Sequence, residues 1–306
     1  MNFLYLTPMG GLGNQMFQIC SLLSWGIDSG SIPKIHRIVL ENCNYWDSPN
    51  VAKRTTYWDT FFASQRKHLV DVMESPRLRM FNIEWTVPHH DDYLLPLIQS
   101  KLETHSVELF CVYGNSYKYF AHNFHKICRE LNIGTMKSEV RSMFAEDFFE
   151  DKVSIHFRFG DFIALKDCHV VLDVEYYKRA VRYVKQARGT DTLTALCFYE
   201  EKDAEIALEY VRELSSENVS FVKVYNATDW QDMLMMSLCR DHITANSTFS
   251  WWGAYLNERV DSRVACPSFQ DYWVRPEFYK EREIDISKFD TDKDLFPPGW
   301  RVFKSL

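Results

Sequence analysis

The second half of the chain begins with the sequence VSIHFRFGDF, residues 153–162. This segment is an apolar strand that runs into a histidine, an arginine, a glycine and an aspartate. From here on, strand and helix patterns alternate regularly. Such alternation is typical of an α/β fold in which a doubly wound parallel sheet is covered by helices on both faces. We expect strands at residues 153–157, 193–199, 219–224, 242–245 and 263–265, and helices at 174–188, 202–214, 229–239 and 248–257.

The first half is also α/β, but its pattern is less regular. A short apolar strand at residues 3–6 is followed by a glycine-rich turn and a helical pattern over residues 14–25. An acidic stretch before residue 152 marks the change in rhythm. We therefore expect two domains, residues 1–150 and 151–306, with the tail after about residue 286 packed back on the first. In the first domain we also expect strands at residues 38–40, 78–83 and 107–113, and a long helix at 117–131.

Composition limits the partners of the chain. Its net charge of -7 argues against general affinity for nucleic acid or anionic membranes, since both require an excess of lysine and arginine. Any bound anion must therefore be held by a local cationic site. No stretch approaches the roughly 18 apolar residues that span a bilayer, and the eight cysteines form no C-x-x-C pair. We expect a cytoplasmic protein without a transmembrane segment, and the oligomeric state stays open.

Arg158 is the first candidate functional residue. In open parallel sheets, ligands bind at the carboxyl ends of the strands, and Arg158 follows such a strand. The planar guanidinium makes paired, charge-assisted hydrogen bonds to phosphate oxygens, which suits a diphosphate. The alternative is an ion pair between Arg158 and Asp161 that closes the strand.

A second candidate is the segment NSTFS, residues 246–250, where a short strand runs into a helix. The start of that helix offers unpaired N–H groups and hydroxyl donors from Ser247 and Thr248, which together form an anion site. The alternative is ordinary capping of the helix by Ser247 or Thr248, with Trp251 and Trp252 as core aromatics.

A third segment, GGLGNQMFQ at residues 10–18, is a glycine turn at the start of a helix. Its spacing differs from the G-x-G-x-x-G dinucleotide motif, and no acidic residue follows at the expected distance. A Rossmann oxidoreductase is therefore disfavoured. The glycines still allow close approach of the backbone to a ligand, and the amides of Asn14 and Gln15 can both donate and accept hydrogen bonds.

Together, the three segments resemble the alpha-1,2-fucosyltransferase family, whose members share the elements G-x-G-N-Q-x-F-Q, H-x-R-R-G-D-[YF] and N-S-[ST]-F-S-W-W in this order. The resemblance implies a GT-B architecture, in which two Rossmann-like lobes face each other across a cleft. It also implies transfer of fucose from GDP-fucose, with inversion and without a metal or other cofactor, to the 2-hydroxyl of a galactose-containing glycan.

The resemblance assigns roles by position. Arg158 would neutralise the leaving diphosphate of GDP. Transfer also requires a base that takes the proton of the acceptor hydroxyl. Asp161 is the nearest candidate, with His156 and Asp167 behind it. Guanine and ribose would lie near Glu200, Glu201 and Asp229. The other expected donor-binding residues are Gly13, Asn14 and Gln15 from the first lobe, and Asn246, Ser247, Thr248, Phe249 and Ser250 from the second.

One departure from the family pattern is Phe159, which stands where the family has a second arginine. Because adjacent side chains of a strand face opposite ways, residues 158 and 159 need not both meet the diphosphate. The departure leaves two alternatives open: transfer of another nucleotide-linked sugar, or a non-catalytic nucleotide- or glycan-binding relative. A metal site is not expected, because the Asp-x-Asp run at residues 290–294 lies in the tail and is predicted to be a solvated turn.

Overall fold

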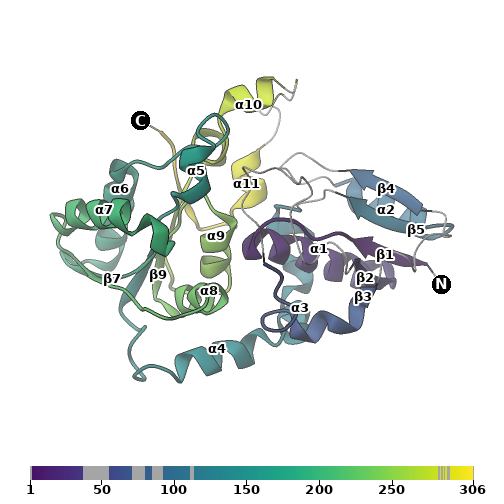
Figure 1. Cartoon of the computed structure of the whole chain (residues 1–306), viewed down its shortest axis with the longest axis horizontal. Helices are drawn as coiled ribbons and strands as arrows, with labels where there is room; N and C mark the ends of the chain where they lie inside the picture. The colour runs from purple at the N-terminus through teal and green to yellow at the C-terminus, as the bar shows by residue number, and fades with distance from the viewer. Residues whose placement is uncertain are drawn as a thin grey trace. The chain divides into compact units, whose positions relative to one another are not determined.

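The computed structural model describes residues 2–36, 55–70, 80–84, 92–110, 114–281 and 290–305, together with residues 283, 285 and 287. The chain forms two compact units, Met1–Gly134 with Asp294–Phe296, and Thr135–Lys293 with Pro297–Leu306. Each unit contains one parallel sheet (Figure 1). The expected α/β class with parallel sheets is confirmed, and the cleft between two lobes stays a prediction.

The sheet of the second unit has six parallel strands in the order β11-β10-β9-β6-β7-β8. The chain enters at the centre in β6, moves outward through β7 to β8, returns to β9 beside β6, and then moves outward in the other direction. β6 and β9 therefore form the switch point of a doubly wound sheet, as expected. The strands are β6 (Lys152–His156), β7 (Leu193–Phe198), β8 (Val219–Val222), β9 (Asp241–Ile243), β10 (Val264–Pro267) and β11 (Arg301–Phe303).

Helices cover both faces of this sheet (Figure 1). α6 (Val174–Arg188) and α7 (Ala204–Ser215) lie on one face, and α8 (Asp229–Leu238) and α9 (Thr248–Tyr255) on the other. All four helices and the first five strands are confirmed to within a few residues of the expected ranges. α6 begins and ends where its sequence dictates, because Asp173 accepts a hydrogen bond from the Tyr176 amide and Gly189 adopts a φ of 65°.

Alternation along β6 separates a core face from a second, more polar face. Val153, Ile155 and Phe157 are buried in the hydrophobic core that α6 and α7 share with the sheet. On the opposite face, Ser154 Oγ lies 2.8 Å from His242 Nδ1 of β9. His156 on the same face lies beside the Phe249 ring of α9, with ring centroids 5.6 Å apart. The strand period of two thus directs every second side chain toward α9.

The described residues of the first unit form a five-stranded parallel sheet in the order β3-β2-β1-β5-β4. The expected strand at residues 3–6 is confirmed as β1, and the helix after it, α1 (Leu12–Ser29), is longer than expected. The strand expected at residues 38–40 lies outside the described residues. The other described elements are β2 (Ile32–His36), β3 (Leu69–Val70), β4 (Met80–Glu84), β5 (Ser106–Phe110), α2 (Leu94–Leu102) and a 3-10 helix at Ala63–His68.

The prediction of a long helix at residues 117–131 is wrong. Two 3-10 turns, Tyr117–Tyr119 and Ala121–Asn123, precede a short α3 (Phe124–Glu130). Phe120 is fully buried and has a non-helical φ of -132°, and the Asn123 amide donates to Ser24 Oγ and Asp28 Oδ1 of α1. Packing against α1 therefore interrupts the helical pattern.

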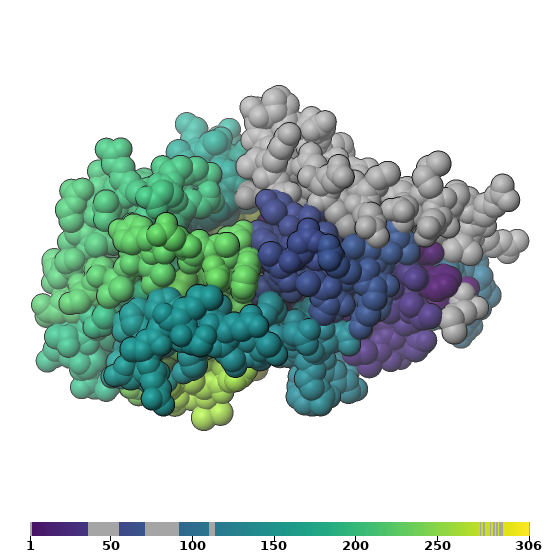
Figure 2. All heavy atoms as spheres, turned by 60° about the horizontal axis from the view of Figure 1, so that its bottom comes forward, coloured from purple at the N-terminus to yellow at the C-terminus, as the bar shows by residue number. Residues whose placement is uncertain are grey.

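α4 contacts a different unit from the one expected, and the tail is divided between the two units. α4 (Ile133–Arg141) contacts the second unit, where Lys137 Nζ donates to the Leu256 carbonyl at 2.9 Å. Figure 2 shows the dark teal atoms of this region against the bright green atoms of α8 and α9. Of the tail, Asp294–Phe296 belongs to the first unit, where Ser116 Oγ donates to the Asp294 carbonyl at 2.6 Å. The tail then forms β11 in the second sheet, a strand that the sequence analysis did not predict.

The Asp-x-Asp run at residues 290–294 is not a solvated turn, so that expectation is wrong. It contributes to α11 (Thr291–Leu295), in which Asp292 accepts a hydrogen bond from the Phe269 amide at 2.7 Å. Leu295 is buried. The remaining helices are α5 (Gly160–Ala164), a π-helical turn at Phe269–Trp273 and α10 (Pro276–Lys280), with a 3-10 turn at Glu201–Asp203.

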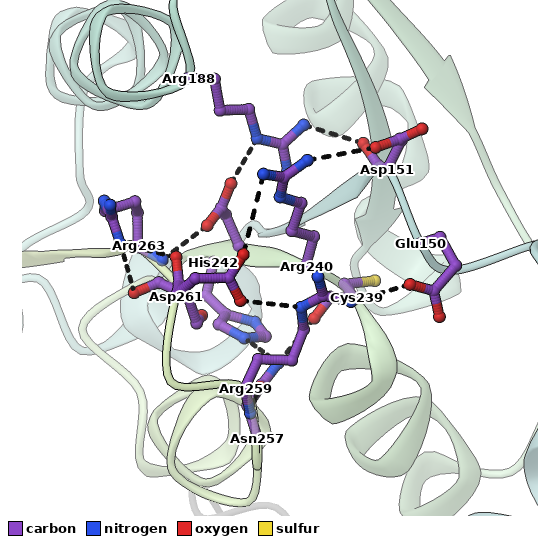
Figure 3. Close-up of polar contacts among 12 residues, drawn as sticks. Glu150, Asp151, Arg188, Cys239, Arg240, His242, Asn257, Arg259, Asp261 and Arg263 are labelled. Carbon is purple, nitrogen blue, oxygen red and sulfur yellow. Dashed lines mark hydrogen bonds and ion pairs between the residues drawn. The ribbon is translucent and has the colours of Figure 1, made fainter.

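A network of charged residues holds the amino ends of β6 and β9 (Figure 3). Arg188 pairs with the buried Asp241 and donates to the Asp151 carbonyl at 2.9 Å. His242 lies beneath this network, and its Nε2 accepts from Asn257 Nδ2 at 2.8 Å, so its Nδ1 carries the hydrogen toward Ser154. Burial, together with Lys137 and Arg188, lowers the pKa of His242 to about 3.

We predict that His242 makes the fold acid-sensitive. Its pKa is about 3 in the folded chain and about 6.5 when unfolded, so the unfolded chain binds one more proton between these values. The stability contributed by the neutral ring is present above about pH 6.5 and is lost as the pH falls toward about 3. For His242→Gln, the free energy of unfolding should fall less steeply with acidification, by about 1.4 kcal/mol per pH unit.

Urea unfolding at several pH values between 4 and 7 measures this slope. His125→Gln, at an exposed position of the first unit, is the matched control. An unchanged slope in His242→Gln would contradict the neutral, buried state of the ring.

Candidate active site

The structure brings two of the three expected segments together at the switch point of the second sheet. Arg158 follows the carboxyl end of β6, and Ser247 caps α9 just after β9. β6 and β9 are neighbours, with Ile155 opposite Ile243. The contact between the His156 and Phe249 rings joins the two segments directly. Ligands of doubly wound sheets bind at this position, in the crevice beyond the strand ends.

Arg158 is held by two carboxylates. Its guanidinium pairs with Asp161 of α5 and with Glu200, which follows β7. The Arg158 side chain is 14% exposed, and its guanidinium carbon lies 5.2 Å from the centre of the Phe162 ring. The ion pair with Asp161 that the sequence analysis gave as the alternative is therefore present. A diphosphate that binds Arg158 would compete with these carboxylates, of which Glu200 is the more exposed, at 38% against 21%.

The start of α9 contains both structural and accessible groups. The Asn246 amide donates to the carbonyls of Val170 and Tyr272, so both of its hydrogens are used inside the fold. Ser250 Oγ is buried and accepts from the Ala245 amide at 3.1 Å. These two residues shape the turn, and the donor contact expected of them stays a prediction. Ser247, Thr248 and Phe249 are partly exposed, and Ser247 also caps the helix by accepting from the Phe249 amide. Trp251 and Trp252 are fully buried core residues.

His156 is a buried, neutral ring at the centre of this arrangement. Burial, with a smaller contribution from Arg158, lowers its pKa to about 3. A group with this pKa is a weak base near neutral pH, which argues against His156 as the residue that takes the acceptor proton. His156 Nδ1 has no hydrogen-bond partner among the described residues. An unsatisfied buried nitrogen costs about 1–3 kcal/mol, which a bound ligand with a hydrogen-bonding group could recover.

Phe159 lies on the other face of the strand from Arg158. It is 1% exposed and packs in the core, with its ring 6.3 Å from Phe157 and 5.1 Å from Tyr210 between centroids. The alternation expected at residues 158 and 159 is thus what the structure shows. The next residue, Gly160, has a φ of +39° and donates its amide hydrogen to Asp203 Oδ2 at 2.8 Å.

The glycine segment of the first unit is a tightly packed turn. Gly10 has a φ of +77°, and a Cβ placed there would lie 2.5 Å from Asn14 Nδ2. Gln15 is fully buried and donates to the Gly10 and Thr55 carbonyls, both at 2.9 Å. Gly13 is also buried, whereas Asn14 is partly exposed. Gly13 and Gln15 thus lie in the first turn of α1, and contact of Gly13, Asn14 or Gln15 with a donor stays a prediction.

Sequence reasoning missed the ion pair between Glu200 and Arg158 and the neighbouring Lys202. Glu200 was expected near a ribose, and its contact with Arg158 was not foreseen. The available signal was the run EEKD at residues 200–203, which directly follows an expected strand and so lies at the carboxyl edge of the sheet. Within the described residues, no group of three or more His, Cys, Asp or Glu side chains is arranged to hold a metal ion.

Comparison with known proteins identifies the family of the chain. Residues 99–285, more than half of the chain, match the family Glycosyl transferase family 11. The chain belongs to this family. The matched range contains both segments of the second-unit site, and membership confirms the resemblance that the motifs indicated. Glycosyl transfer is thus the class of reaction that the site has to support.

The chain is also similar to individual relatives and to solved structures. The chain is 24% identical to an alpha-1,2-colitosyltransferase of Escherichia coli over 88% of this chain and 97% of that protein. It is 34% identical to the O-antigen biosynthesis glycosyltransferase WbnK of Escherichia coli, over 37% of each chain. The crystal structure of the fucosyltransferase NodZ from Bradyrhizobium aligns with 84% of this chain and 94% of its own, at 11% identity and a TM-score of 0.43. No described helix is long and apolar enough to cross a membrane.

We predict that Phe159→Arg destabilises this member of Glycosyl transferase family 11. The substitution places a charge in the core beside Phe157 and Tyr210, and a buried charge without a partner costs about 3 kcal/mol or more. Phe159→Leu, the apolar control, should cost about half as much or less. Urea unfolding measures both. An arginine variant as stable as the leucine variant would show that residue 159 can reach the polar face.

Proposed function

We propose that this chain transfers fucose from GDP-fucose to a hydroxyl of a galactose-containing glycan, forming an alpha-1,2 linkage with inversion and without a metal. The observation that carries the proposal is the position of Arg158 and the start of α9 at the switch point of a doubly wound sheet. Membership of Glycosyl transferase family 11 supports the reaction class. The three sequence motifs support the choice of donor and acceptor.

The chemistry requires that negative charge on the leaving diphosphate be stabilised. Arg158 can make two parallel charge-assisted bonds to phosphate oxygens, and the N–H groups and hydroxyls of Ser247 and Thr248 add donors at the start of α9. Because these groups are fixed by the sheet, little reorganisation is needed as the charge develops. Asp161, one turn beyond Arg158, either takes the acceptor proton or orients the guanidinium.

A second candidate function is transfer of another sugar in the same linkage. The relative that covers most of the chain is named an alpha-1,2-colitosyltransferase. This supports the alpha-1,2 linkage, and it favours a donor sugar other than fucose as the first alternative. We also propose that the enzyme works in the cytoplasm, because the thiols of Cys20, Cys197, Cys239 and Cys266 are reduced and buried in the fold.

The donor nucleotide is tested by binding. GDP should raise the melting temperature of the chain, and UDP and ADP should raise it less at the same concentration. Arg158→Ala should weaken GDP binding at least about tenfold, since charge-assisted bonds to phosphate are lost. Arg158→Lys should recover part of this loss, because lysine keeps the charge but not the planar fork. Arg182→Ala, which removes an exposed arginine paired with Glu217, is the control.

The reaction is tested with GDP-fucose and a panel of galactosides, followed by linkage analysis of the product. We expect release of GDP and a 2-linked fucosyl product, with kcat/KM unchanged by EDTA. Loss of activity with chelator would contradict the metal-free mechanism. Turnover with a different GDP-sugar but not with GDP-fucose would establish the alternative donor.

A further inference from the structure

Glu200 links two cations at the carboxyl edge of the second sheet. One carboxylate oxygen pairs with Arg158 Nη1, and the other lies 2.7 Å from Lys202 Nζ. Glu200 follows β7, the strand that pairs with β6 along its whole length. A single anion therefore holds together the expected diphosphate-binding arginine and a lysine that no motif singled out.

Lys202 lies next to the turn that follows Phe159. A Cβ placed on Gly160 would be 3.4 Å from Lys202 Cε and 3.4 Å from Glu200 Oε1. Lys202 and Glu200 therefore both lie against the backbone of Gly160, two residues after Arg158. The Lys202 side chain is 58% exposed, so its ammonium group can move without disturbing the core.

A diphosphate needs more positive charge than Arg158 alone supplies. A nucleoside diphosphate carries about three negative charges when it leaves, and without a metal these have to be met by side chains and N–H groups. A cationic side chain at residue 159 could not supply this charge, because residue 159 faces the core. The second cation must therefore come from another element that reaches the same edge.

We propose that Lys202 is the second cation of the diphosphate site, and that Glu200 holds Arg158 and Lys202 together until the diphosphate takes its place. The inference rests on the proposed function. Binding exchanges one carboxylate, shared by two cations, for a diphosphate shared by the same two cations. Glu200 thus orders both side chains and also competes with the donor.

Lys223 is the rival cation. It lies after β8, one strand further from β6, a step of about 4.8 Å. Its Nζ donates to the Tyr199 carbonyl at 3.2 Å and lies 4.0 Å from the centre of the Tyr199 ring. These contacts occupy Lys223 at the neighbouring strand end, whereas Lys202 shares its carboxylate with Arg158. Lys202 is therefore the better placed of the two.

The test compares guanosine with GDP. The dissociation constant of guanosine divided by that of GDP isolates the contribution of the diphosphate, because both ligands carry the same base and ribose. Relative to wild type, Lys202→Gln should lower this ratio about fivefold or more, and Lys202→Arg should restore most of it. Glu200→Gln should raise the ratio, since it frees both cations from a competing carboxylate. Lys178→Gln, which removes a lysine paired with Glu213 on α7, should leave the ratio unchanged.

The outcomes distinguish failure of the proposed function from failure of the inference on Lys202. If wild type binds no GDP, the proposed function fails, and this inference fails with it. If wild type binds GDP and Arg158→Ala lowers the ratio, but Lys202→Gln matches wild type, only the inference on Lys202 is overturned. A lower ratio in Glu200→Gln would overturn the competing role of Glu200, and a larger loss in Lys223→Gln than in Lys202→Gln would assign the second cation to Lys223. Melting temperatures of all variants verify that each one folds.

Discussion

Successive side chains of β6 face opposite sides of the second sheet, and the site depends on this constraint. The odd-numbered residues from Val153 to Phe159 fill the core against α6 and α7. His156 consequently faces α9, and Arg158 points away from the core toward Asp161 and Glu200 at the carboxyl edge of the sheet. A shift of the strand by one residue would bury a guanidinium in the core and expose the aromatic rings. Burial of these apolar residues therefore fixes the direction of Arg158, the arginine proposed to bind the diphosphate.

The charges around Arg158 show how an acidic protein can hold an anion. The chain has a net charge of -7, yet at this edge two cations converge on one carboxylate. Asp161 and Glu200 compensate the charge of a largely buried guanidinium, which would be costly without partners. The same pairs keep the guanidinium in place, so little conformational entropy remains to be lost when an anion binds. Pre-organisation and competition are thus two effects of the same contacts.

Much of the second unit could be predicted because its signals are local. α6 has an aspartate cap and a terminal glycine, and the regular strand spacing predicts a parallel sheet, so the carboxyl ends of its strands had to share an edge. The three-residue β11 could not be predicted, since it is stabilised by pairing with β10, more than 30 residues earlier in the chain. Packing of Phe120 and Asn123 against α1 likewise overrode a helical pattern in the first unit.

Within the site, the motifs predicted which segments of the second unit meet. They did not predict which side chains remain available to a ligand. Asn246, Ser250 and Gln15 are polar residues in the motifs, but the amide hydrogens of Asn246 and Gln15 and the Ser250 hydroxyl make hydrogen bonds inside the fold. Glu200 and Lys202 lie outside the motifs, and only the folded sheet places them beside Arg158. Hydrogen bonding and burial in the tertiary structure decide these roles, and sequence patterns do not encode them.

The central claim is that the Arg158 guanidinium and the start of α9 together bind a nucleotide diphosphate. A crystal structure of the protein with GDP tests it most directly. The account predicts phosphate oxygens within hydrogen-bonding distance of the Arg158 guanidinium and of the amides or hydroxyls at Ser247 and Thr248. A bound GDP whose phosphates lie elsewhere, with Arg158 still paired to both Glu200 and Asp161, would contradict it.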